Sequence, residues 1–207
     1  MKSPEPSAST TPGAITRTLN IADPGPLGLA AFALTTFVLS IFNAGLLDVK
    51  AQPVVFGLAL FYGGIVQLVA GVMEFLKNNM FGAVAFCSYG GFWMSYWYLA
   101  THPALFAADA PKLQGVGVFL LGWTIFTAYM TVVVSRLNGG LFATFSVLLV
   151  AFIALTIGDL FGIHIATRIG GFFGIGAAFL AWYNSFAGLM NMASGKVVMP
   201  TWPRKAH

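Results

Sequence analysis

The chain has 207 residues, of which 58% are hydrophobic and only 8% are charged, and its formal net charge is +4. The mean hydropathy is +0.84. This composition excludes an ordinary water-soluble domain and indicates an integral membrane protein.

Six largely apolar stretches are long enough to cross a membrane. A hydrocarbon core of about 30 Å needs about 20 helical residues. The stretches are continuous rather than alternating, which favours helices over the strands of a β-barrel. The predicted spans are residues 27–46, 54–76, 81–100, 115–135, 141–158 and 169–190. We therefore expect one all-α transmembrane domain of six helices.

The predicted domain covers residues 23–195, with a tail at each end. Residues 1–22 are rich in Ser, Thr and Pro and are expected to be disordered, and residues 196–207 form a short basic tail. Six spans put both ends on one side of the membrane. Seven of the ten basic residues lie on that side: Lys2, Arg17, Lys77, Arg136, Lys196, Arg204 and Lys205. This bias predicts a multi-pass protein of the cell membrane with both termini in the cytoplasm.

A short pattern recurs in the odd-numbered spans. The segments "GLAAF" (28–32), "GAVAF" (82–86) and "GLFATF" (140–145) each place a Gly shortly before a Phe. Such an echo fits three helical hairpins around a pseudo-threefold axis that enclose a path within each protomer. Chance is the alternative, because the chain contains 24 Gly and 20 Phe residues.

The second span carries a stripe of small and polar residues on one helical face. Gly63, Gln67, Gly71 and Glu74 follow steps of three or four residues. Polar groups are costly in lipid, so this face is expected to meet other helices or water. Gln67 then forms an interhelical hydrogen bond or lines a path. Glu74 is either proton-linked or a structural carboxylate paired with Lys77.

No motif for enzymatic chemistry, metal binding or a cofactor is found. The three histidines fall in connectors and at the last residue, and no glycine-rich phosphate loop is present. A single cysteine, Cys87, allows no intrachain disulfide. No basic helix suggests a nucleic-acid partner. Transport is therefore the favoured class, and a receptor or sensor that does not transport is the alternative.

Three motifs resemble those of the acetate uptake transporter family, the bacterial succinate-acetate permeases and their fungal relatives. They are "DPGPLGLAAF", "ALFYGGIVQLVAGVMEF" and "FGAVAFCSYGGFWMSYW". The resemblance implies a six-helix protomer, commonly a homohexamer, with a path in each protomer for acetate, related small monocarboxylates or succinate. It also implies coupling to protons. The lipid bilayer and further copies of the chain are the expected partners.

The family's entrance motif, Asn-Pro-Ala-Pro-Leu-Gly-Leu, is altered in this chain. Pro24, Pro26 and Gly28 are kept, whereas Asp23 replaces the Asn and Gly25 replaces the Ala. The charge of Asp23 is expected to repel an anion at the mouth unless the carboxyl is protonated or caps the helix.

The resemblance also assigns a constriction of the path. Its Phe and Tyr correspond to Phe32 and Tyr89, and its Leu corresponds to Leu148, with Val147 as the alternative. Without the resemblance, Phe32 and Leu148 are expected to pack in the core. The predicted path-lining residues are Thr35, Asn43, Gln67 and Ala177.

The resulting hypothesis is proton-coupled transport of acetate through a hydrated path interrupted by an apolar ring. Such a ring passes a small, partly dehydrated acid and can also gate by dewetting. Three alternatives remain open: a passive anion channel, a channel for ammonium or small neutral solutes, and a membrane sensor without transport.

Overall fold

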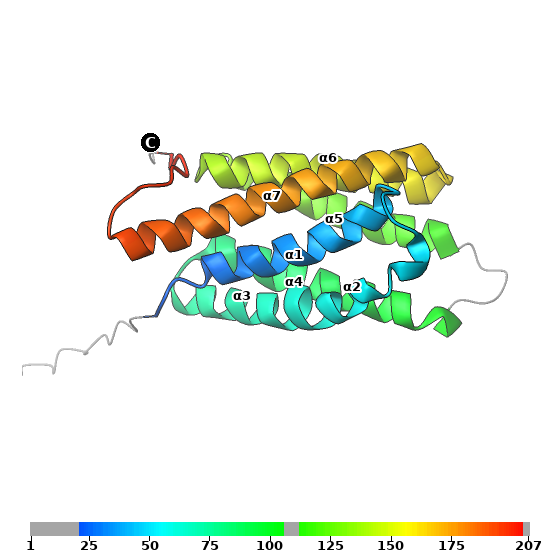
Figure 1. The fold of residues 1–207 in the computed structure, drawn as a ribbon, viewed down its shortest axis with the longest axis horizontal. Helices are drawn as coiled ribbons and strands as arrows, with labels where there is room; N and C mark the ends of the chain where they lie inside the picture. The colour runs from blue at the N-terminus through cyan, green and yellow to red at the C-terminus, as the bar shows by residue number, and fades with distance from the viewer. Residues whose placement is uncertain (1–20, 106–111, 205–207) are drawn as a thin grey trace, which may run out of the picture.

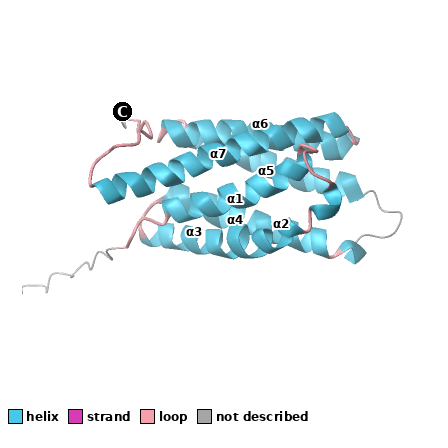
Figure 2. Ribbon diagram, viewed as in Figure 1, coloured by secondary structure: helices cyan, strands magenta, loops and turns pink. Residues whose placement is uncertain are grey.

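A computed structural model describes residues 21–105 and 112–204. Within these ranges every regular element is a helix, apart from one isolated bridge between Asn138 and Pro203 (Figure 2). The long helices are α1 (Gly25–Asn43), α4 (Met80–Thr101), α5 (Lys112–Val134), α6 (Gly139–Phe161) and α7 (His164–Ser194). The second span is one continuous helical segment made of α2 (Val54–Gly57), η2 (Leu58–Val66) and α3 (Gln67–Leu76). Short turns η1 (Val49–Ala51) and η3 (Pro103–Leu105) lie in connectors.

The six predicted spans are confirmed as helices, with the largest differences around the last connector. Gly162, with a φ of +68°, ends α6 in a left-handed turn, and α7 begins at His164. Arg168, expected in a connector, is therefore inside α7. Its Nε donates to the carbonyl of Ala44 at 3.2 Å and so satisfies the C-terminal end of α1.

Five of the six segments are apolar enough over a sufficient length to span a membrane. The exception within the described ranges is α4, whose "SYGGFWMSYW" stretch introduces Ser, Gly, Tyr and Trp. Three aromatic side chains of this stretch, Tyr89, Phe92 and Trp93, are buried in the bundle.

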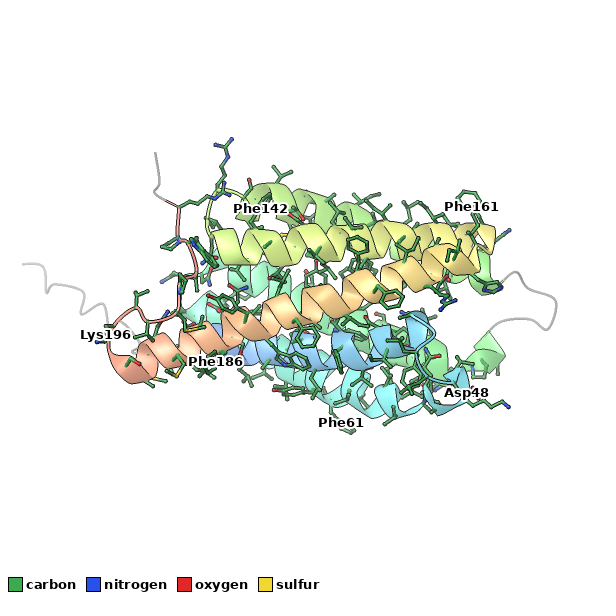
Figure 3. All side chains as sticks on the ribbon, turned by 45° about the horizontal axis from the view of Figure 1, so that its top comes forward. Asp48, Phe61, Phe142, Phe161, Phe186 and Lys196 are labelled. Atoms are coloured by element: carbon green, nitrogen blue, oxygen red, sulfur yellow. The ribbon has the colours of Figure 1, made fainter. Side chains whose placement is uncertain are left out.

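The helices lie side by side along the long axis of the molecule, and both ends of the described chain lie at the same end of the bundle (Figure 1). α6 packs between α5 and α7, α7 packs on α1, and α1 packs on η2 and α3, which in turn packs on α4. The first and third predicted hairpins, α1 with η2 and α3, and α6 with α7, pack closely, whereas α4 and α5 of the second have few close backbone approaches and meet through side chains such as Tyr89 and Thr127. Large apolar side chains such as Phe61 and Phe186 point outward (Figure 3) and are 62% and 51% exposed, as expected of a surface in contact with lipid.

Two glycines bring the helices of the bundle close together. A Cβ atom added to Gly28 of α1 would lie 2.7 Å from the Phe86 ring of α4. One added to Gly63 of η2 would lie 2.7 Å from Oγ1 of Thr35 on α1. In a membrane, where close packing drives helix association, such contacts hold α1 against its neighbours.

The segment after α7 folds back over the start of α6. The amide of Gly139 donates to the Trp202 carbonyl at 2.8 Å, and that of Gly140 donates to the Thr201 carbonyl at 3.1 Å. Asn191 fixes this segment, since its Oδ1 accepts from the amides of Val198 and Met199 at 2.8 Å. Part of the predicted tail 196–207 is thus packed against the bundle.

Candidate transport path

Two cavities lie inside the bundle. The near cavity, of about 230 Å³, is at the end of the bundle where the described chain begins and ends, since Asp23 and Thr201 line it. The far cavity, of about 530 Å³, is at the opposite end, where Asn43, Gln52 and Asp159 line it.

Three side chains line both cavities: Phe32 from α1, Tyr89 from α4 and Leu148 from α6. We call them the boundary triad. They are 7%, 3% and 5% exposed, so little space remains between them. The rings of Phe32 and Tyr89 are in direct contact, with centroids 5.7 Å apart. The boundary between the cavities is therefore narrow and largely apolar.

The structure distinguishes the two candidates on α6. Leu148 lines both cavities, whereas Val147 lines neither and faces Gly176 of α7, where an added Cβ would lie 3.4 Å from its Cγ1. Adjacent helical residues point about 100° apart, which is why the two side chains have different surroundings. Leu148 is the one at the cavities.

The near cavity contains buried polar side chains from α3 and α7. Gln67 of α3 and Asn184 of α7 line it, with exposures of 0% and 6%. Glu74, also on α3, is 1% exposed and accepts from Nδ2 of Asn79 at 2.9 Å. The stripe predicted on the second span is thus divided: Gln67 and Glu74 line the cavity, while Gly63 packs against Thr35.

A cation at the mouth of the near cavity compensates the altered entrance motif. Lys77 Nζ lies 2.7 Å from Asp23 Oδ1, which also accepts from the amide of Gly25 at 3.1 Å. Asp23 therefore caps α1 and is neutralised by Lys77. The predicted pairing of Lys77 with Glu74 is wrong, because Lys77 reaches across to α1 and Asn79 is the partner of Glu74.

The remaining entrance residues position α1. Pro26 lines the near cavity, and its carbonyl accepts from Ser185 Oγ at 2.6 Å. Pro24 lies just before the first helical residue, and its carbonyl accepts from the amide of Gly28 at 3.0 Å. The motif therefore anchors the start of α1 beside the cavity.

The far cavity is lined by aromatic and neutral polar side chains. Thr36, Asn43 and Trp93 are among them, and the amide of Gln52 donates to the Tyr96 hydroxyl at 2.8 Å. Among the described lining residues Asp159 is the only one with a charged side chain. Asp159 lies just beyond the predicted span 141–158 but inside the observed helix, because α6 continues to Phe161.

Unpaired buried polar groups gather at the cavities. In residues 21–105 and 112–204, buried side-chain nitrogen or oxygen atoms without a hydrogen-bond partner occur in four residues: Thr36, Gln67, Trp93 and Asn184. Gln67 and Asn184 line the near cavity, and Thr36 and Trp93 line the far cavity. Leaving such a group unpaired costs about 1–3 kcal/mol, so their location indicates spaces that receive water or a polar solute.

Two predicted path-lining residues are not at either cavity. Thr35 is fully buried and donates to the Ala31 carbonyl at 2.9 Å, and it packs against Gly63. Ala177 of α7 is also fully buried, in the hydrophobic core between the helices. The cavities are instead lined by four polar residues that were not predicted: Thr36, Trp93, Asn184 and Asp159. Thr36 and Trp93 could have been predicted from helical spacing, because each lies four residues after a member of the boundary triad.

Comparison with known proteins places this geometry in context. Ammonia transport outward protein 2 of Saccharomyces cerevisiae is 42% identical over 184 residues, which are 86% of this chain and 65% of that protein. Acetate permease A of Emericella nidulans is 40% identical over 194 residues, 86% of this chain and 65% of that protein. The chain thus spans slightly less than two thirds of these fungal relatives.

A bacterial protein matches over nearly its whole length. The succinate-acetate/proton symporter SatP of Escherichia coli K12 is 34% identical over 180 residues, 87% of this chain and 95% of that protein. A solved structure described as the bacterial acetate channel SatP superposes with a TM-score of 0.82 at 34% identity, covering 88% of this chain and 99% of the other. The profile of the GPR1/FUN34/yaaH family matches residues 7–204, and the chain belongs to this family.

Proposed function

We propose that the chain transports acetate and related small monocarboxylates, with succinate as a larger substrate, across the cell membrane. The near cavity, the boundary triad and the far cavity form the path. The observation that carries the proposal is that three apolar or aromatic side chains line both of two cavities, each of which is also lined by unpaired buried polar groups. Relatives named an acetate permease and a succinate-acetate/proton symporter support this substrate class.

The path suits passage rather than tight capture of a carboxylate. A carboxylate in hydrocarbon loses its hydration at high cost, whereas hydrogen bonds from neutral donors replace that hydration in part. Gln67 on one side of the boundary triad and Thr36 and Trp93 on the other provide such donors. Lys77, the basic residue at the near cavity, is already paired with Asp23.

Proton coupling follows from the same physics. A carboxylate accompanied by a proton crosses the apolar boundary triad without net charge, which removes most of the barrier at that point. Glu74 is the group that we assign to the proton, because it is buried at the near cavity, which Gln67 also lines, and its one described hydrogen-bond partner is the neutral Asn79. Uptake then runs from the far cavity to the near cavity in a homohexamer whose termini are cytoplasmic.

Ammonia transport is the second candidate, because a relative with 42% identity is named for it. Ammonia and acetate place different demands on the path. An ammonium ion only donates hydrogen bonds, whereas a carboxylate only accepts them. Competition between the two solutes therefore separates the candidates.

The test is flux into liposomes that contain the purified chain. Uptake of [14C]acetate is measured with and without an inwardly directed proton gradient, beside protein-free liposomes that report leak of the free acid. We expect uptake above leak and further stimulation by the gradient. Uptake above leak without stimulation would indicate a passive channel, and uptake equal to leak from correctly inserted protein would contradict acetate transport.

A further inference from the structure

The helices that carry the boundary triad are parallel to one another. The near cavity is lined by the first turns of α1, α4 and α6, and the far cavity is lined by residues later in the same helices. Because one turn of helix rises about 5.4 Å, the residues four positions after the triad lie one level farther along the path. They are Thr36, Trp93 and Phe152, and all three line the far cavity.

This second level combines two hydrogen-bond donors with an apolar wall. The Trp93 side chain is 2% exposed and that of Thr36 is 7% exposed, and neither Trp93 Nε1 nor Thr36 Oγ1 has a hydrogen-bond partner among the described residues. Thr36 differs in this respect from the neighbouring Thr35, whose hydroxyl donates to the carbonyl four residues earlier. Phe152, 5% exposed, offers only its ring.

The donors determine which solute fits. An indole N–H is a donor and never an acceptor, so it is complementary to a carboxylate and mismatched to ammonium. A hydrogen bond to a charged acceptor is also stronger than one between neutral groups. The apolar face of Phe152 suits a methyl group at the other end of a two-carbon acid.

We propose that Thr36 and Trp93 form a carboxylate-binding station in the far cavity, immediately beyond the boundary triad, with the methyl group of the acid toward Phe152. This proposal rests on the proposed function. It identifies the two hydrogen-bond donors that bind the carboxylate group of the substrate. Asp159 belongs to the same cavity but lies seven residues beyond Phe152, about 10 Å along α6. Its charge therefore acts at the outer part of the cavity rather than at the station.

Conservative substitutions test the station. W93F keeps an aromatic ring and removes the N–H, and T36V keeps the shape and removes the hydroxyl. W123F and T35V are the matched controls. Trp123 packs on Tyr89 and Phe92, Thr35 is the helical neighbour of Thr36, and neither of them lines the near or the far cavity. In liposomes, W93F and T36V should each raise the KM for [14C]acetate about tenfold, while the controls stay within about twofold of wild type. Unchanged KM values for W93F and T36V would overturn the station.

The outcomes separate the station from the proposed function. Failure of wild-type protein to move acetate contradicts the function itself, whereas normal wild-type flux with unaffected variants contradicts only the station. If a variant fails to elute like wild type in size-exclusion chromatography, the station is tested on wild-type protein instead, by recording NMR spectra of its ¹⁵N-labelled Trp indoles. Sodium acetate should shift one indole signal and ammonium chloride should not; no shift with acetate, or an equal shift with ammonium, would overturn the station.

Discussion

The hydroxyl of Tyr89 is bound to Oγ1 of Thr127, 2.9 Å away on α5. Thr127 donates its own proton to the Trp123 carbonyl at 2.7 Å, so Tyr89 must be the donor in the first bond. Tyr89 therefore contributes its ring to the boundary triad, while its proton is committed to α5. A direct hydrogen bond from this hydroxyl to the solute is therefore not favoured by the geometry.

Replacing Tyr89 by Phe should consequently leave transport largely intact. We expect the KM for acetate to stay within about twofold of wild type, with a loss of stability of about 1 kcal/mol from the broken bond to Thr127. Flux in liposomes and thermal unfolding in detergent measure the two effects. A large increase in KM would show that the hydroxyl does reach the solute.

Leu148 is expected to limit substrate size. L148A removes three carbons from the boundary triad and should allow larger acids such as lactate to pass, with lactate uptake rising several-fold relative to acetate. V147A is the control, because Val147 lines neither cavity. Equal selectivity of L148A and wild type, or the wider selectivity in V147A instead, would contradict this placement.

The Asp23–Lys77 pair should influence anion passage more than stability. The two side chains are 58% and 37% exposed, and ion pairs in such positions contribute about 0–1 kcal/mol. K77M leaves Asp23 uncompensated at the near mouth and should lower acetate flux about two- to threefold, less so at high salt. The double variant D23N/K77M should recover flux, whereas a persistent loss would point to a direct role of Lys77.

Asp159 should oppose entrance of an anion into the far cavity. D159N removes the one charge among the described lining residues and should lower the KM for acetate about two- to threefold at low ionic strength. The effect should shrink as salt is added. An increase in KM would instead make Asp159 a required participant in transport.

Sequence patterns located the helices well because membrane thickness sets their length. The span 54–76 agrees with the observed segment at both ends, and the motifs identified Phe32, Tyr89 and Leu148, which the structure brings together. Their role as a constriction stays a prediction. The first turn of α7 was missed because His164 and Arg168 are polar, although Arg168 is satisfied by the end of α1.

Helix rotation and long-range pairing were harder to predict. Thr35 and Thr36 are neighbours in an apolar span, and only the packing of α1 on η2 shows that Thr35 faces Gly63 while Thr36 faces the far cavity. Lys77 pairs with Asp23 across 54 positions rather than with the nearer Glu74, because α1 begins beside the end of α3. Such contacts depend on how the helices assemble, which local patterns do not contain.

The central claim is that the solute crosses between Phe32, Tyr89 and Leu148, and acetate flux through L148W tests it most directly. An indole at this position fills the small space between the cavities. Wild-type protein and V147A should carry [14C]acetate above leak, and L148W that elutes like wild type should reduce flux to leak. Wild-type flux in L148W would show that acetate does not pass the boundary triad.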